Sequence, residues 1–129
     1  RPTGWWSLAK QPARKKVVVL IRRTPLGSVK GSEALRHSVG LTLAANQVTA
    51  VLIGPAVWLP TPLAPDRIAA GEVKKHIDML PRLKGRVVVE RESLAAQGID
   101  PSRLLPGVEV IGHQEVVSLL TEAEVVIPF

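Results

Sequence analysis

Short runs of β-branched apolar residues recur along the chain, and segments with helical periodicity separate them. The runs consist mainly of Val, Ile and Leu and are four to seven residues long, as in VVVLI and VTAVLIG. They predict five strands, near residues 17–22, 48–53, 86–90, 108–111 and 125–128. Because these runs do not alternate between apolar and polar residues, both faces of the sheet are expected to be covered, as in parallel sheets.

The segments between the strands predict helices that begin and end at recognisable signals. They are expected to cover residues 33–46, 66–80, 93–97 and 114–123. Ser32 and Asp66 are suited to be N-caps, and Gly98 is well placed at the end of the third helix. Ile77 and Leu80 fall on the apolar stripe of the second helix.

Strands that alternate with helices predict an α/β protein, a three-layer α/β/α sandwich with a parallel sheet of about five strands. The length of 129 residues suits one domain. We place this domain at residues 17–129, with a basic N-terminal arm at 1–16. The proline-rich stretch 55–65 is expected to be a loop.

The positive charge of the chain is concentrated in this arm. The formal net charge is +6, and residues 1–16 contain five bases and no acid. The domain itself is therefore nearly neutral, which disfavours a nucleic-acid partner. Trp5 and Trp6 leave three alternatives open: the arm packs on the domain or is disordered, docks on a partner subunit, or lies on a membrane surface.

The chain contains no cysteine, which excludes disulfides, thiolate metal sites and a cysteine nucleophile. His37, His76 and His113 match no zinc-binding spacing, so neither a metal nor another cofactor is expected. The apolar runs are too short for a membrane span of about 20 residues. The expected location is the cytoplasm, without a membrane partner.

A glycine-containing loop between the first strand and the first helix is a candidate anion pocket. Gly27, Ser28, Gly31 and Ser32 are the residues concerned. Backbone N–H groups at a helix N-terminus can bind anions. The spacing matches neither a Walker A loop nor G-x-G-x-x-G, and a simple strand-to-helix turn explains the glycines equally well.

The turn ERES, residues 90–93, is the second candidate site, because it follows the third strand at its carboxyl end. Glu90 and Glu92 form a possible acid–base pair if one carboxyl pKa is raised, but ordinary solvated charges are favoured there. Ser93 belongs to no G-x-S-x-G nucleophile elbow. A structural hydrogen bond or a cap is the favoured role of His113.

The order of these segments resembles the DsrE/DsrF-like (TusD/TusC-like) family of sulfur-relay proteins. The resemblance is carried by TPLGSVKGSEALRHSVGL, VTAVLIGPAVWL, KGRVVVERESLAAQGI and GVEVIGHQEVVSLLTEAEVVIPF, which together cover most of residues 17–129. In sulfur-accepting relatives, a cysteine after the third strand takes up a persulfide. That position falls on Glu90 here, and a second family cysteine falls on Ser93.

Because it lacks the acceptor cysteine, the chain resembles the cysteine-less DsrF-type subunits, which assemble with active subunits. The resemblance implies a non-catalytic subunit or accessory protein of an intracellular sulfur-relay or sulfur-oxidation system. Its expected partner is another copy of itself or a cysteine-bearing paralogue. Two alternatives remain: a stand-alone small-molecule or anion-binding module, and a hydrolase or transferase that uses Glu90, Glu92 or Ser93.

Four residues are the predicted contacts of such an assembly: Val57, Trp58, Leu59 and Arg91. Arg91 is suited to pair with a carboxylate of a neighbouring subunit, and the segment around Trp58 supplies apolar area. In the alternative interpretation, the charges of the turn face water and Trp58 is buried in its own subunit.

Overall fold

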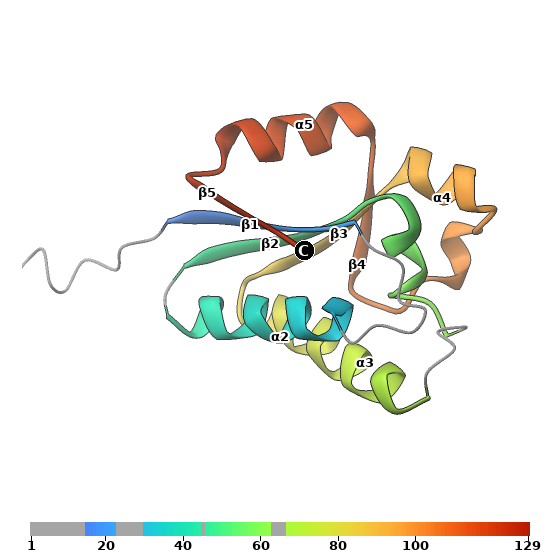
Figure 1. Ribbon diagram of the computed structural model, residues 1–129, viewed down its shortest axis with the longest axis horizontal. Coiled ribbons are helices and arrows are strands. Elements are labelled where there is room, and N and C mark those ends of the chain that lie inside the picture. The colour runs from blue at the N-terminus through green and yellow to red at the C-terminus, as the bar shows by residue number, and fades with distance from the viewer. Residues whose placement is uncertain (1–14, 23–29, 45, 63–66) are drawn as a thin grey trace, which may run out of the picture.

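The computed structural model describes residues 15–22, 30–44, 46–62 and 67–129, except the side chains of 30–32 and 67–73. Five strands form one parallel sheet in the order β4-β3-β2-β1-β5 (Figure 1). They are β1 (Lys16–Ile21), β2 (Gln47–Leu52), β3 (Arg86–Glu90), β4 (Val108–Ile111) and β5 (Val125–Pro128). The predicted parallel sheet is thus confirmed, with each strand within one residue of its predicted place.

Helices cover both faces of the sheet, which confirms the three-layer sandwich (Figure 1). On one face lie α2 (Lys30–Leu43) and α3 (Arg67–Arg82), and on the other lies α5 (His113–Glu122). The short helix α4 (Arg91–Gln97) follows β3 directly, so it lies at the carboxyl ends of the strands. There it contacts the 3₁₀ helix η1 (Gly54–Trp58).

Two apolar clusters hold the layers together, one on each face of the sheet. The larger cluster joins alternate residues of β1, β2 and β3 to α2 and α3, and its fully buried side chains include Leu35, Leu52, Ile77 and Leu80. The smaller cluster lies beneath α5 and consists of Val18, Val51, Val88, Ile111 and Val116. The central strands therefore bury both faces, as their unbroken apolar sequences predict.

The helix ends agree only in part with the sequence signals. Gly98 ends α4 in the left-handed conformation, with φ 70°, as predicted. Ser32 lies inside α2, which begins at Lys30, so its predicted role as N-cap is wrong. Asp66, the other predicted N-cap, lies outside the described residues.

Short 3₁₀ helices form in two stretches for which the sequence predicted no helix. Residues 54–58 of the proline-rich segment form η1, and Pro101–Arg103 form η2. In η2 the Asp100 carboxylate accepts a hydrogen bond from the Ser102 N–H at 2.9 Å. Both helices have proline in the first turn, where its missing N–H group costs no hydrogen bond.

Candidate functional site

The ERES turn is built around a hydrogen bond between two of its own side chains. Glu90 is the last residue of β3 and the N-cap of α4, and Ser93 lies in the first turn of that helix. The Ser93 hydroxyl donates to Glu90 Oε1 at 2.5 Å and accepts from the Gly54 N–H at 2.9 Å. Ser93 is only 7% exposed, so these bonds satisfy a hydroxyl that water barely reaches.

The other oxygen of Glu90 contacts the last helix of the chain. Glu90 Oε2 lies 2.9 Å from Nδ1 of His113, the first residue of α5. The strands explain this contact, because β3 and β4 pair with Glu90 opposite Ile111, two residues before His113. The Glu90 side chain is 13% exposed, so the expectation of an ordinary solvated charge is wrong for this residue. The predicted structural role of His113 agrees with the contact.

Glu92 takes the place of a missing N-cap on α5. The N-cap residue Gly112 has no side chain, and the Glu92 carboxylate accepts the His113 N–H at 3.0 and 3.1 Å. This hydrogen bond, together with one from the backbone of Glu92 itself, lowers the pKa of the Glu92 carboxyl below its usual range. A carboxyl group that acts as a general acid needs the opposite shift.

The charge state of His113 is coupled to Glu90. The hydrogen bond from the imidazole to Glu90, with the attraction of that carboxylate, raises the pKa of His113 above its usual range. The contacts form a chain in which the Gly54 N–H contacts Ser93, Ser93 contacts Glu90, and Glu90 contacts His113. In a serine triad the imidazole contacts the serine hydroxyl, whereas here the Glu90 carboxylate lies between them and accepts the hydrogen bond of the hydroxyl. The arrangement therefore fixes three elements rather than activating Ser93 as a nucleophile.

The residues predicted at a subunit interface lie beside this network and differ in exposure. Val57 and Leu59 are buried in the core of the chain, so only Trp58 and Arg91 reach the surface. Trp58 is half-buried, and its indole N–H donates to Gln97 Oε1 of α4 at 3.0 Å. Arg91 is exposed and reaches the N-terminus of α5 beside Gly112. Val57 and Leu59 are thus withdrawn from the surface, and an interface at Trp58 and Arg91 remains a prediction.

The structure does not complete the candidate anion pocket. Gly27 and Ser28 lie outside the described residues, and Gly31 and Ser32 lie in the first turn of α2, where only the backbone is described. Within the described residues, no group of three His, Asp or Glu side chains is placed to hold a metal ion. In that same part of the chain, every helix is too short or too polar to cross a membrane.

Sequence reasoning missed the contributions of Gly54 and Gln97. Both belong to contacts between residues 39 positions apart, which local periodicity does not report. The sequence did contain a signal for the contact between Glu90 and His113. Both residues stand at or just after the end of a predicted strand, and such residues of two neighbouring parallel strands meet at one edge of the sheet. Using that signal requires the strand order, which the sequence pattern alone does not determine.

Solved structures with the same fold share little sequence with this chain. YchN from E. coli has a TM-score of 0.77 and 20% identity, over 89% of this chain and 99% of YchN. MTH1491, a protein of unknown function from Methanobacterium thermoautotrophicum, has a TM-score of 0.68 and 20% identity, over 88% of this chain and 97% of MTH1491. These similarities concern the fold alone.

Sequence comparison defines the relationship more closely. A search of curated proteins gives no match. The sequence profile of the DsrE/DsrF-like family, in contrast, matches residues 15–129, which include all five strands and the turn with Glu90 and Ser93. The chain therefore belongs to the DsrE/DsrF-like family.

Proposed function

We propose that the chain is a non-catalytic subunit or accessory protein of an intracellular sulfur-relay or sulfur-oxidation system, and that it acts by assembling with copies of itself or with a cysteine-bearing paralogue. One observation carries the proposal. The two positions that we equate with the acceptor cysteines hold Glu90 and Ser93, which are hydrogen-bonded to each other.

The chemistry of these two side chains differs from that of a sulfur acceptor. A persulfide forms on a thiolate, and the chain has no cysteine. The Glu90 carboxylate makes no stable bond to sulfane sulfur, and the Ser93 hydroxyl is occupied as donor and acceptor. The turn thus keeps a strand-to-helix geometry while its side chains link β3, η1 and α5.

The exposed parts of the same region support a role in assembly. Arg91 presents a guanidinium group at the carboxyl end of the sheet, where it is able to form a bidentate pair with a carboxylate of another subunit. Trp58 lies on the neighbouring η1 and is half-buried, so that part of the residue is accessible. Partly exposed Trp and Arg are the residue types that dominate interface energies.

The test is size-exclusion chromatography with light scattering, on the chain alone and mixed with a cysteine-bearing paralogue from the same genome. We expect a mass above that of the monomer in at least one sample, and a smaller mass for Trp58→Ala and Arg91→Glu. Arg103→Glu is the matched control, because Arg103 is also an exposed arginine and lies on η2.

Circular dichroism establishes that each variant is folded before its mass is interpreted. A strict monomer in both samples would contradict the proposal. Unchanged assembly of folded Trp58→Ala and Arg91→Glu would contradict the placement of the interface at the turn.

A further inference from the structure

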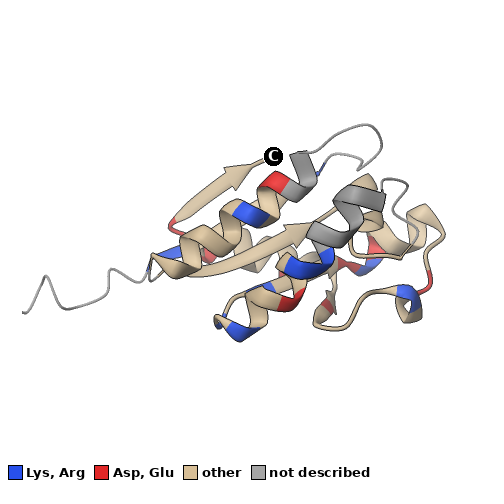
Figure 2. Cartoon of the chain, turned by 90° about the horizontal axis from the view of Figure 1, so that it is seen from below, with Lys and Arg blue, Asp and Glu red and all other residues tan. Residues whose placement is uncertain are grey.

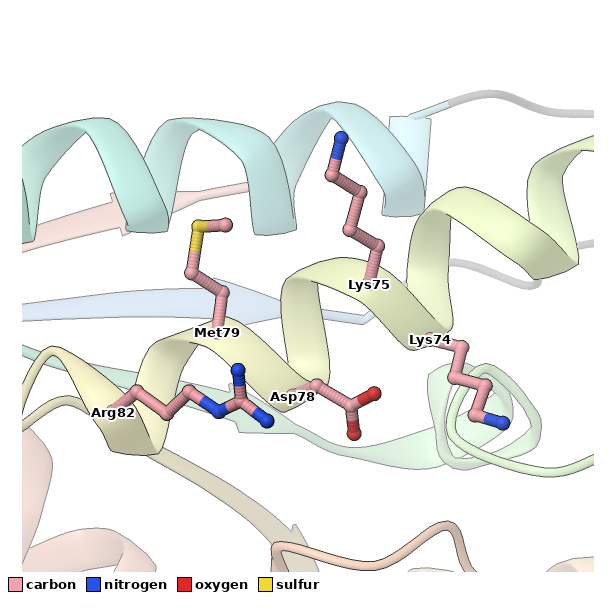
Figure 3. A pocket seen from close by; sticks show the side chains of 5 residues that line it. All are labelled: Lys74, Lys75, Asp78, Met79 and Arg82. Carbon is pink, nitrogen blue, oxygen red and sulfur yellow. The ribbon is translucent and has the colours of Figure 1, made fainter.

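A hollow of about 370 Å³ lies along α3 and is lined by side chains of that helix alone. They are Lys74, Lys75, Asp78, Met79 and Arg82 (Figure 3). All four charged residues are exposed, so water already solvates them well. Figure 2 views this side of the molecule and shows acidic segments among the basic ones on α2 and α3. This hollow therefore shows no preference for a particular ligand.

A second hollow, of about 150 Å³, lies at the amino ends of the strands, beneath the last turn of α5. Its polar side chains come from three neighbouring strands and one helix: Lys16 of β1, Gln47 and Thr49 of β2, Arg86 of β3 and Glu122 of α5. The strand register brings them together, because Lys16 pairs with Gln47 and Thr49 pairs with Arg86. This hollow thus lies at the opposite end of the sheet from the ERES turn.

Thr49 is the buried polar residue of the second hollow. It is only 8% exposed, and alternation along β2 places its side chain on the face that α5 covers. Of the four buried polar residues in the described part of the chain, Ser38, Thr61 and Ser93 form hydrogen bonds through their hydroxyls, whereas the Thr49 hydroxyl forms none there. Because buried polar groups without a partner are rare, this hydroxyl indicates a partner that enters the hollow.

Two bases of the same hollow keep hydrogen-bond donors free. Arg86 is held in place by Glu109, whose carboxylate accepts hydrogen bonds from Nε and Nη2 at 2.9 and 3.1 Å, and Glu115 attracts the guanidinium as well. Nη1 of Arg86 has no partner in the described part of the chain. The Lys16 side chain forms no ion pair among the described residues. With the Thr49 hydroxyl, these groups offer donors to a carboxylate.

Acidic groups border the hollow on its other side. Glu122, the last residue of α5, lines it, and Glu124 accepts the backbone N–H of Lys16 at 3.3 Å. The last carbonyls of α5 add partial negative charge, and no basic residue stands in the last turn of this helix. An anion alone would be repelled by Glu122, and a cation alone would be repelled by the two bases.

We propose that the second hollow binds a small zwitterion of the α-amino acid class. The carboxylate of this ligand lies against Nη1 of Arg86, the ammonium group of Lys16 and the hydroxyl of Thr49. Its own ammonium group lies against Glu122 and the C-terminus of α5. A single small molecule then satisfies both signs of charge and the buried hydroxyl.

The size and the apolar wall of the hollow limit the ligand further. Its volume of about 150 Å³ is well below the roughly 300–1,000 Å³ of pockets that hold drug-sized molecules, so the ligand has few atoms. Val18, Leu119 and Ala123 line the remaining wall, which suits a short apolar side chain. The inference is independent of the proposed function, because it uses neither the ERES turn nor the interface at Trp58 and Arg91.

Titration of the isotope-labelled full chain with L-alanine, followed by amide NMR spectra, tests the site. Acetate and methylammonium, which each carry one of the two charges, are titrated in parallel at constant ionic strength, up to about 0.1 M. We expect saturable shifts of the Thr49, Arg86 and Ala123 amides with L-alanine. Its dissociation constant should be at least about tenfold lower than that of either half-ligand, because only L-alanine pairs with both signs of charge.

Thr49→Val removes the hydroxyl and keeps the shape of the side chain. It should weaken L-alanine binding about tenfold and leave the melting temperature unchanged or raised, because the hydroxyl has no partner within the described chain. Thr61→Val is the matched control. Thr61 is also buried, and its hydroxyl donates to the Trp58 carbonyl at 2.6 Å, so this variant should melt at a lower temperature and bind L-alanine as wild type does.

Glu122→Gln should weaken L-alanine binding about tenfold but strengthen acetate binding, because it removes a charge that attracts the ammonium group and repels the carboxylate. Glu33→Gln, exposed on α2, should change neither. Absence of saturable shifts with L-alanine would overturn the proposal, as would equal binding of acetate or methylammonium, or full binding by Thr49→Val. Each of these results leaves the mass measured with a cysteine-bearing paralogue unaffected, so failure of this site and failure of the proposed function are distinguishable.

Discussion

The Glu90 carboxylate connects parts of the molecule that are far apart in the sequence. One oxygen accepts the hydroxyl of Ser93, which in turn holds the Gly54 N–H of η1, and the other contacts His113 of α5. The side chain is mostly shielded from water, so each lost partner would leave a polar group poorly solvated. Glu90, at the position that we equate with an acceptor cysteine, thus holds α4, η1 and α5 together through hydrogen bonds.

Replacing Ser93 by Ala should reduce stability by about 1–3 kcal/mol, because the Gly54 N–H loses its acceptor and Glu90 loses a donor in a buried setting. Urea unfolding followed by circular dichroism measures the free energy of unfolding. Ser118→Ala, on the exposed side of α5, should change it by less than about 0.5 kcal/mol. Equal effects of the two substitutions would show that the Ser93 hydrogen bonds contribute little.

The raised pKa of His113 predicts a pH dependence of stability. Protonated His113 is held by Glu90 in the folded chain, so its contribution is fully present below the unfolded pKa of about 6.5 and is lost as pH rises through the higher folded pKa. For Glu92, whose pKa is lowered, the contribution is present above about 4.3 and is lost as pH falls through the folded pKa.

An NMR titration of the imidazole protons measures the His113 pKa directly. Glu90→Gln should lower it, because the neutral amide no longer stabilises the imidazolium. Glu33→Gln, an exposed substitution on α2, should leave it unchanged. An unchanged His113 pKa in Glu90→Gln would refute the coupling.

At the scale of elements, two glycines show that backbone conformation alone can decide whether substitution by alanine stabilises or destabilises the chain. A Cβ at Gly98 or at Gly40 would meet no atom within 4 Å. Gly98 ends α4 with φ 70°, where an L-residue is strained by about 1–2 kcal/mol, so Gly98→Ala should destabilise the chain. Gly40 lies inside α2, so Gly40→Ala should stabilise it by about 0.5–1 kcal/mol. Thermal and urea unfolding of both variants provide the measurement, and a common sign would contradict the argument.

The helices and strands were largely predictable because their signals are local. The runs around Val19, Val51 and Val88 are β-branched and uninterrupted, and each forms a fully or almost fully buried strand. The start of α2 was not predictable from Ser32, because a residue suited to cap a helix is also tolerated inside one. The 3₁₀ helix η1 was missed because Pro55 within a proline-rich stretch predicts a loop.

The site was predictable in its location but not in its contacts. The carboxyl end of β3 drew attention to Glu90, Glu92 and Ser93. Two features of the site depend on β4 lying beside β3 and on the direction of the chain after Gly112. They are the shielding of Glu90 from water and the capping of α5 by Glu92. Such contacts join residues more than 20 positions apart and follow from tertiary packing.

At the scale of the whole molecule, the sheet is covered unequally. Two long helices bury the larger cluster on one face, whereas α5 alone covers the other and contributes a single fully shielded side chain, Val116, among the described residues. Leu119 and Leu120 of α5 remain half-buried. Since apolar burial is the main stabilising contribution, the two faces are expected to differ in local stability.

Native-state hydrogen exchange should therefore show α5 opening at a lower free energy than β1, β2 and β3. Val116→Ala should lower the opening free energy of α5 by about 1–2 kcal/mol, from about 0.8 kcal/mol for each buried methylene-sized group, and should affect the strands less. Leu80→Ala, on the opposite face, should lower the free energy of global unfolding by about 2–5 kcal/mol and so affect strands and helices together. If the amides of α5 and β2 exchange at the same free energy in wild type, the molecule opens as one unit despite its unequal layers, and the smaller cluster holds α5 as firmly as the larger one holds α2 and α3.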